Sequence, residues 1–144
     1  MKIKSIFADN TKIPEKYTCD GNNINPAIEI SDVLKGAKSL VLIVDDLDAP
    51  GGTFVHWVVW NISPKTEIIA EDSIPEDSMQ GINSAGRQGY LGPCPPSGTH
   101  RYRFKLYAPD TALSLPTSSK RADVESAMKN HILAQAILIG LYSS

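Results

Sequence analysis

Apolar positions follow the short period of β-strands along most of the chain. Residues 38–46 are apolar at both odd and even positions, which is typical of a central strand covered on both faces. Residues 54–61 are rich in β-branched and aromatic side chains and predict a second buried strand. Alternation of side-chain type indicates a third strand at 100–108. The pattern also favours shorter strands at 2–7, 26–31 and 66–70.

Alternation in the strand at 100–108 separates a core-facing side from a mainly basic side. The first side carries His100, Tyr102, Phe104 and Leu106, and the second carries Arg101, Arg103, Lys105 and Tyr107. Successive side chains of a strand point to opposite faces. We therefore expect His100 and Tyr102 on the core-facing side, at the beginning of the strand.

One segment has the spacing of a helix. From Arg121 to about Leu133, side chains suited to one buried face recur at Val124, Ala127, Met128, His131 and Ile132. Ser118 or Ser119 is the predicted N-cap. We interpret His131 as a packing or capping residue. Residues 136–142 either extend the helix or form a last strand, and Gly140 with its β-branched neighbours favours the strand.

Length and composition indicate one globular domain. With 144 residues, 42% hydrophobic and 21% charged, the chain is expected to form a single mainly β domain over 1–144, with a C-terminal helix. The net charge of −2 argues against nucleic-acid binding, which calls for a basic stripe. No apolar run reaches the roughly 20 residues of a membrane helix, and no secretory signal is recognisable. We therefore expect a cytoplasmic protein without integral membrane association.

Residues 92–98 form a proline- and glycine-rich loop before the strand at 100–108. Three prolines and two glycines in these seven residues restrict the loop to few conformations. A stiff loop that contains Cys94 and leads to His100 is typical of one wall of a binding pocket. A tight connection between two strands is the alternative interpretation.

Groups suited to binding an anion stand near the ends of three predicted strands. Asp46 ends the first long strand, His56 lies within the second, and His100 and Tyr102 begin the third. A carboxylate that bonds one imidazole nitrogen fixes its tautomer. Two imidazoles held in this way, beside backbone N–H groups of a glycine-containing loop, make a receptor for a small anion such as phosphate.

We predict that Asp46, His56 and His100 converge within a few ångströms around one concave site, with Tyr102 as an additional hydroxyl donor. Each group also has a simpler interpretation. The acidic run of Asp45, Asp46 and Asp48 can be a solvated turn. His56 can be a core histidine, and His100 can be a structural residue.

The two cysteines, Cys19 and Cys94, are far apart in the sequence and form no C-x-x-C pair. In a reducing cytosol we expect free thiols rather than a disulfide, an expectation that a thermophilic source would weaken.

A free Cys94 permits a hydrolase-type enzyme in which Cys94 is the nucleophile, His100 or His56 the base, and Asp46 its orienting carboxylate. Against this mechanism, the flanking prolines supply neither a helix N-terminus nor a neighbouring cation to lower the thiol pKa. A metal site built from Asp46, His56, His100 and Cys94 is chemically allowed, but no recognisable ligand spacing supports it.

Three motifs resemble those of a known family: Asp46-x-Asp48-Ala49-Pro50, Val55-His56-Trp57 and Gly92-Pro-Cys-Pro-Pro-Ser-Gly-Thr-His100-Arg-Tyr102. They are similar to motifs of the phosphatidylethanolamine-binding proteins, and more closely to the bacterial and archaeal branch of Raf kinase inhibitor-like proteins. Segments 13–22 and 131–142 fit as well, so the resemblance covers nearly the whole chain.

The resemblance implies a large, antiparallel-rich β-sheet packed against a smaller sheet, with a helix near the C-terminus. It also implies a surface pocket for phosphate-like groups and phospholipid head groups. Carried over by position, the pocket residues are Asp46, His56, Gly92, Pro93, Cys94, Pro96, His100 and Tyr102.

Three departures from the family pattern lie near this pocket, one of which is the expected absence of the C-terminal helix that borders the pocket in animal members. Leu47 stands where eukaryotic members commonly have proline, and the loop between Pro50 and His56 is short, which implies a more open pocket. These departures weigh against binding of lipid tails and of Raf kinase. The resemblance and the need for a sharp turn after Asp48 predict a candidate cis bond between Ala49 and Pro50.

We therefore favour a non-enzymatic binding or regulatory protein with an anion pocket, no cofactor and no metal. In the alternative that the family suggests, the protein inhibits a kinase or a serine protease through protein–protein contacts. The family's example also suggests a homodimer.

Overall fold

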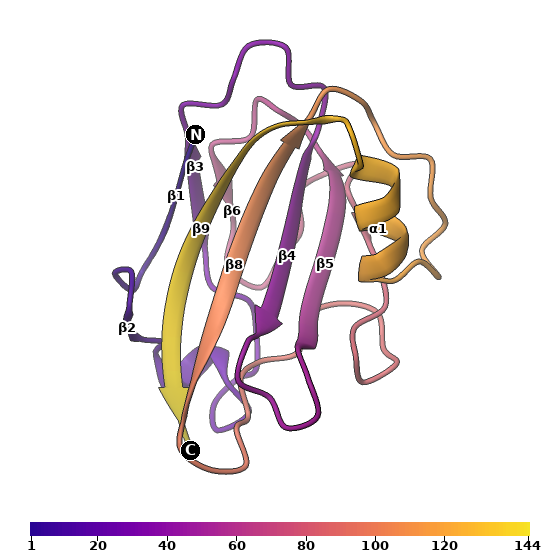
Figure 1. Ribbon diagram of the computed structural model, residues 1–144. Helices are drawn as coiled ribbons and strands as arrows, with labels where there is room; N and C mark the ends of the chain where they lie inside the picture. Colours follow the sequence, from indigo (N-terminus) through magenta and orange to yellow (C-terminus); the bar gives the residue numbers. More distant parts are fainter.

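The computed structural model describes residues 1–144 and contains two β-sheets and one α-helix (Figure 1). The small sheet has the strand order β1-β3-β6, and the large sheet has the order β2-β9-β8-β4-β5-β7. The strands are β1 (Lys2–Ser5), β2 (Thr11–Lys12), β3 (Ile28–Ser31), β4 (Leu40–Asp46), β5 (Phe54–Ile62), β6 (Ile68–Ile69), β7 (Met79–Gln80), β8 (Thr99–Pro109) and β9 (Ile132–Ser143). The helices are the 3-10 turn η1 (Glu15–Tyr17) and the α-helix α1 (Arg121–Met128). This arrangement confirms the predicted mainly β fold.

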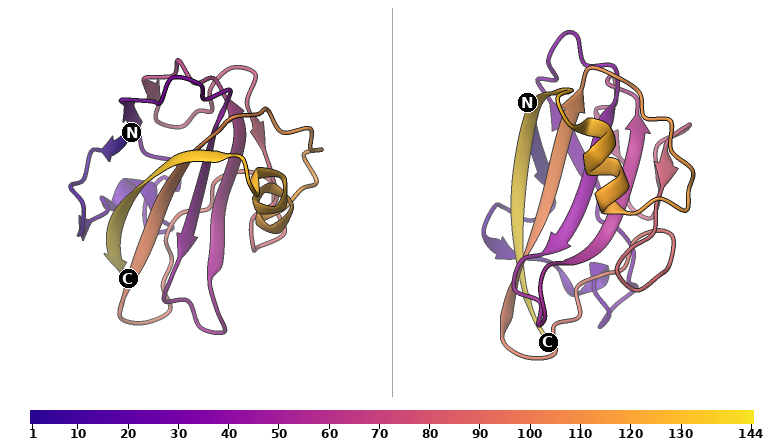
Figure 2. Two further views of the ribbon diagram at one scale, coloured as in Figure 1. Left: turned by 45° about the horizontal axis from the view of Figure 1, so that its top comes forward. Right: turned by 45° about the vertical axis from the view of Figure 1, so that its right-hand side comes forward.

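The large sheet is buried on both faces at its centre. Its strand pairs are antiparallel, except for the parallel pair of β2 and β9. The even-numbered apolar residues of β4 (Leu40, Leu42 and Val44) belong to a core of 19 buried residues that includes Ile28 and Ile30 of β3. The odd-numbered apolar residues, Val41 and Ile43, belong to a second core with Val124 and Met128 of α1. The small sheet and α1 thus lie on opposite faces of the large sheet (Figure 2), and β4 is the doubly covered strand that its apolar run predicts.

Helix α1 is shorter than the helical spacing predicts. It ends at Met128, because Asn130 adopts a left-handed backbone conformation with φ of 68° and β9 begins two residues later. His131 lies on the surface in this connection, with Nδ1 2.7 Å from Asp110 Oδ1. The tail is a strand, as predicted.

The predicted N-cap of α1 is also wrong. Lys120, rather than Ser118 or Ser119, is the N-cap residue. The Ser119 carbonyl accepts a hydrogen bond from the Ile82 N–H (2.9 Å), which holds this part of the chain in an extended bridge.

The bond between Ala49 and Pro50 is trans, so the predicted cis geometry is wrong. Two glycines reverse the chain instead. Gly51 and Gly52 have φ of 81° and 120°, and the Gly52 N–H donates to the Ala49 carbonyl at 3.3 Å. Proline followed by a residue with positive φ is the sequence of a type II β-turn, which needs no cis bond.

Candidate functional site

The carboxyl end of β4 and the beginnings of β5 and β8 meet at one end of the large sheet (the lower end of these strands in Figure 1). Because β4 runs antiparallel to both neighbours, its last residue, Asp46, lies opposite Phe54 of β5 and Tyr102 of β8. Asp46, His56 and His100 line one cavity of about 350 Å³ at this end. The structure therefore confirms that these three residues converge.

Asp46 holds His100 in one orientation. Asp46 Oδ2 lies 2.6 Å from His100 Nδ1, and the two side chains are only 5% and 8% exposed. Asp46 Oδ1 accepts a hydrogen bond from the Asp48 N–H at 2.8 Å. Because an ionised carboxylate can only accept, His100 Nδ1 carries the proton in this bond and Nε2 is left for another partner.

A β-bulge turns His56 toward the cavity. Val44 pairs with Trp57 and Asp45 pairs with Val55, so His56 is an extra residue in β5 without a partner in β4. Bulges of this kind redirect side chains and are frequent next to functional sites. The bulge explains how a histidine inside an apolar strand reaches the pocket.

His56 is buried and its ring is fixed by the backbone. Nδ1 lies 2.7 Å from the Leu91 carbonyl, which can only accept, so Nδ1 donates and Nε2 is available. Burial lowers the pKa of His56 below its usual value, and the Leu91 carbonyl and Asp46 oppose this shift only in part. The imidazole is therefore neutral at pH 7.

Tyr102 places a hydroxyl without a partner beside both imidazoles. The residue is 1% exposed and lines the cavity, and its OH has no partner at ordinary hydrogen-bond length and angle, although the Asp46 carboxylate and the Cys94 N–H lie near it. Its ring centre is 5.3 Å from that of His56 and 6.4 Å from that of His100. Burial and the negative charge of Asp46 raise the pKa of Tyr102, so the OH keeps its proton as a donor. Buried polar groups rarely lack a partner, which points to a ligand or water at this position.

The proline-rich loop forms another wall of the cavity and is joined to the segment after η1 by a disulfide. Cys19 and Cys94 are bonded, with their Cα atoms 5.4 Å apart, so the prediction of free thiols is wrong. Backbone packing explains this pairing across 75 residues. A Cβ on Gly92 would lie 2.5 Å from the Tyr17 carbonyl oxygen, so only glycine allows the two segments this close.

Hydrogen bonds secure the base of this loop. The Gly92 N–H donates to Asn23 Oδ1 at 2.7 Å, and the Cys19 N–H donates to the Pro93 carbonyl at 3.1 Å. Pro93 is buried and does not line the cavity, unlike the other predicted pocket residues. A disulfide also leaves no Cys94 thiol that could act as a nucleophile in this oxidised form.

The rim of the cavity is mostly apolar. Besides the predicted residues, the lining includes Cys19, Ala49, Pro50, Phe54, Leu91 and Pro95. Three of these residues, Ala49, Pro50 and Pro95, lie within the family motifs found in the sequence. Phe54 and Leu91 lie next to those motifs, and nothing else in the sequence marks them as pocket residues. The cavity thus combines buried polar side chains with apolar residues in its lining.

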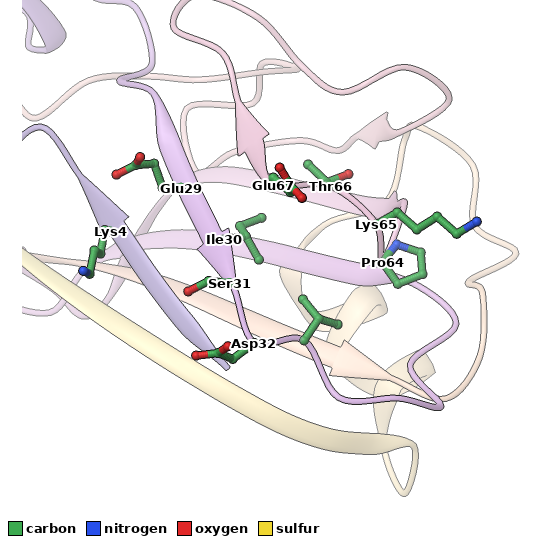
Figure 3. Close-up of a pocket in the computed structure, with 10 residues that line it drawn as sticks. Lys4, Glu29, Ile30, Ser31, Asp32, Pro64, Lys65, Thr66 and Glu67 are labelled. Atoms are coloured by element: carbon green, nitrogen blue, oxygen red, sulfur yellow. The ribbon is translucent and has the colours of Figure 1, made fainter.

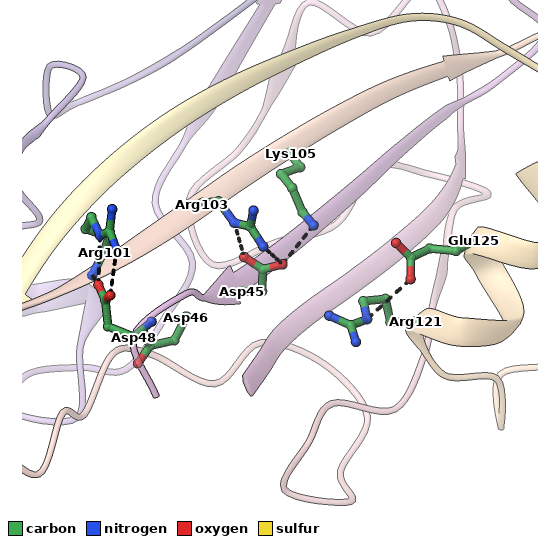
Figure 4. Close-up of polar contacts among 8 residues, drawn as sticks. All are labelled: Asp45, Asp46, Asp48, Arg101, Arg103, Lys105, Arg121 and Glu125. Carbon is green, nitrogen blue, oxygen red and sulfur yellow. Dashed lines mark hydrogen bonds and ion pairs between the residues drawn. The ribbon is translucent and has the colours of Figure 1, made fainter. Parts of the chain in front are cut away.

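The other carboxylates of the acidic run have different partners (Figure 4). Asp45 is fully buried on the α1 side of the sheet, where Arg103 Nε and Lys105 Nζ each lie 2.8 Å from its oxygens. Asp48 pairs with Arg101, whose hydrogen bonds lower the pKa of Asp48 to about 2. The turn after Asp46 is therefore held by ion pairs on either side, and Asp46 alone of the three carboxylates faces the cavity.

A larger cavity, of about 680 Å³, lies beside the small sheet (Figure 3). Its lining mixes charges of both signs, from Lys4, Glu29, Asp32, Lys65 and Glu67, and has no histidine or cysteine. No cluster of three or more His, Cys, Asp or Glu side chains suited to a metal ion is present in residues 1–144. We take the smaller cavity as the candidate site because it combines two buried imidazoles with an unpaired hydroxyl.

Comparison with known proteins gives a consistent match over the whole chain. The sequence model of the phosphatidylethanolamine-binding protein family matches residues 3–143. The chain is 47% identical to UPF0098 protein PH1269 of Pyrococcus horikoshii over 152 residues, which cover 99% of this chain and 76% of that protein. No helix of the structure has the length and apolar character needed to cross a membrane.

Two solved structures share the fold. The first is CT736 of Chlamydia trachomatis, described as a phosphatidylethanolamine-binding protein homolog, with a TM-score of 0.95, 42% identity and 99% and 97% of the two chains covered. The second is E. coli YbcL, described as a new member of the mammalian PEBP family, with a TM-score of 0.92, 28% identity and 99% and 98% covered. Both support the arrangement of two sheets and one short helix.

Proposed function

The chain belongs to the phosphatidylethanolamine-binding protein family, and we propose that it is a non-enzymatic receptor for a small anion. The anion is a phosphate-like group, either free or carried by a small molecule, a lipid head group or a protein. It would bind in the cavity of Asp46, His56, His100 and Tyr102, with the disulfide-linked loop as one wall.

The single observation that supports this proposal best is the unpaired Tyr102 hydroxyl between two oriented imidazoles. Leaving a buried donor unsatisfied is unfavourable by about 1–3 kcal/mol, so a bound oxygen atom would recover that free energy. His100 Nε2 and His56 Nε2 supply two further donors once protonated. Three donors that line one cavity suit a tetrahedral oxyanion better than a neutral ligand.

The charge of Asp46 favours anion binding indirectly. An isolated carboxylate would repel an anion, but Asp46 Oδ2 accepts the hydrogen bond of His100 Nδ1 and fixes the orientation of that ring. His56 is neutral in the empty pocket, because burial lowers its pKa. An incoming anion raises that pKa, so binding takes up a proton.

This coupling sets the direction of the pH dependence. Protonation of His56 adds to the affinity for the anion. This added affinity is complete below the pKa of His56 in the empty pocket, and it is lost as the pH rises through the higher pKa of His56 in the bound state. We expect the dissociation constant for O-phosphoserine and for sulfate to increase between about pH 5.5 and 8. Sulfate keeps its charge over this range, so its pH dependence reports on the protein alone.

Titration calorimetry tests the proposal with matched variants. The double variant His56→Gln and His100→Gln should bind roughly tenfold to a hundredfold more weakly at about pH 6, because it lacks two charge-assisted hydrogen bonds. His131→Gln removes an exposed histidine far from the cavity in the fold and should bind like the parent. Equal affinity of the double variant and the parent would show that the histidines are structural.

Inhibition of a kinase or serine protease is the alternative function, and no feature of the pocket favours it over anion binding. The predicted homodimer also stays a prediction. The disulfide bears on location, because such bonds persist in oxidising compartments and in the cytosol of hyperthermophiles. A cytoplasmic location therefore stays a prediction.

A further inference from the structure

The tip of the proline-rich loop, residues 94–98, is cross-linked to the rest of the protein by one disulfide. No hydrogen bond of ordinary length and angle begins or ends in these residues, and Pro95 and Pro96 have no N–H to donate. The nearest hydrogen bonds are those of Gly92 and Pro93 at the base of the loop. The disulfide of Cys94 with Cys19 is the remaining cross-link.

The same segment forms part of the proposed anion pocket. Cys94, Pro95 and Pro96 line the cavity from the loop, and Cys19 lines it from the segment after η1. The facing wall, with Asp46, His100 and Tyr102, is held by the ladder of β4 and β8. A change in the loop tip would therefore alter the shape of the cavity while the strands stay in place.

The disulfide is accessible. Cys19 and Cys94 are both exposed residues, in contrast to the buried His56 and His100. A dithiol can therefore attack one sulfur. The Cys19–Cys94 bond breaks, a mixed disulfide forms, and the second thiol of the reductant closes its own disulfide. Two electrons and two protons pass from the dithiol to the protein, which then carries two thiols.

We propose that the Cys19–Cys94 disulfide is a redox switch of the pocket, in which the oxidised protein is the binding-competent form. This proposal rests on the proposed anion-binding function. In the oxidised form the loop tip is fixed against the segment that carries Cys19. In the reduced form the stiff loop tip is no longer held against the segment that carries Cys19, and the apparent dissociation constant rises by the inverse of the competent fraction. A competent fraction below about one tenth weakens binding at least tenfold.

Calorimetry with O-phosphoserine measures the effect directly. Oxidised protein is compared with protein reduced by dithiothreitol, at one pH and with the two thiols counted by a thiol reagent. We expect the reduced form to bind at least tenfold more weakly, and the double variant Cys19→Ser and Cys94→Ser to bind like the reduced form. Dithiothreitol should not change binding to the double variant, which controls for effects of the reagent itself.

Nuclear magnetic resonance relaxation gives a readout that needs no ligand. The backbone order parameters of Ser97 and Gly98 should fall below about 0.6 on reduction, while those of Tyr102 and Phe104 stay near 0.85. Equal affinity of the oxidised and reduced forms would overturn the switch and leave the proposed function standing. Absence of binding in both forms would overturn the proposed function and the switch together.

Discussion

Two walls of the same pocket are built in different ways. The strand wall carries Asp46, His56, His100 and Tyr102 at the ends of β4, β5 and β8, where paired strands fix the backbone. The loop wall is the tip of residues 94–98, which makes no hydrogen bond of ordinary length and angle and is cross-linked by the Cys19–Cys94 disulfide. The chemistry of the site thus lies on the rigid wall, and its closure depends on a covalent bond.

This difference has a consequence for stability. Many weak interactions position the side chains of the strand wall. Removing one of these side chains therefore changes the chemistry of the pocket more than its shape. On the loop wall one bond sets the shape, so its loss acts on the whole wall at once. Three measurements sharpen the comparison.

Removal of the disulfide should have the largest effect. The bond closes a loop across 75 residues, for which the chain-entropy relation gives about 4 kcal/mol of stabilisation. We expect the double variant Cys19→Ser and Cys94→Ser to lose most of this free energy of unfolding in urea, without loss of strand content by circular dichroism. A loss below about 1 kcal/mol would mean that the reduced chain is already constrained.

Removal of the buried carboxylate behind the strand wall should rank second. Asp45 is fully buried and bridges Arg103 and Lys105 of β8 (Figure 4). Asp45→Ala leaves both cations without their partner, a change expected to lower the free energy of unfolding by about 3 kcal/mol.

Asp48→Ala is the matched control for Asp45→Ala, because it breaks a comparable pair with the exposed Arg101. Exposed pairs contribute little, so its loss in urea unfolding should be much smaller. Equal losses in the two variants would contradict the importance of Asp45 for holding β4 to β8.

The pH dependence from His56 should be the smallest effect. Burial lowers its pKa in the folded protein, so the unfolded chain binds more protons below about pH 6.5. The stability of the ligand-free protein should therefore fall as the pH drops from about 6.5 through the lower pKa of the folded state. His56→Gln should reduce the change of the free energy of unfolding with pH, measured by urea unfolding at a series of pH values. An unchanged pH dependence in this variant would mean that a group other than His56 causes it.

The strand wall could largely be predicted from the sequence. Apolar runs and alternation of side-chain type located β4, β5 and β8. The antiparallel pairing of β4 with β8 brings Asp46 and His100 together. The orientation of His56 could not be predicted, because it depends on a bulge that simple alternation does not reveal. The predicted end of α1 was also wrong, because the helical spacing of side chains in the sequence continues past Asn130, which has a left-handed backbone conformation.

The loop wall was only partly predictable. Its prolines and glycines predict stiffness and a role in the pocket, but not the partner that holds it. The pairing of Cys19 with Cys94 follows from the close approach at Gly92, a tertiary contact that cysteine spacing does not encode. Similarly, the family resemblance and the need for a sharp turn after Asp48 predicted a cis Pro50, whereas Gly51 and Gly52 make the turn.

The most direct test of anion binding through the histidines is the pKa of His56 with and without ligand. Imidazole ¹⁵N shifts can be followed by nuclear magnetic resonance in oxidised protein, first alone and then saturated with O-phosphoserine. We expect a pKa below the usual value of about 6.5 in the empty pocket and a clear rise when the anion binds, with no change at His131. A His56 pKa that stays the same in saturated protein would contradict the proposed role of this histidine in binding.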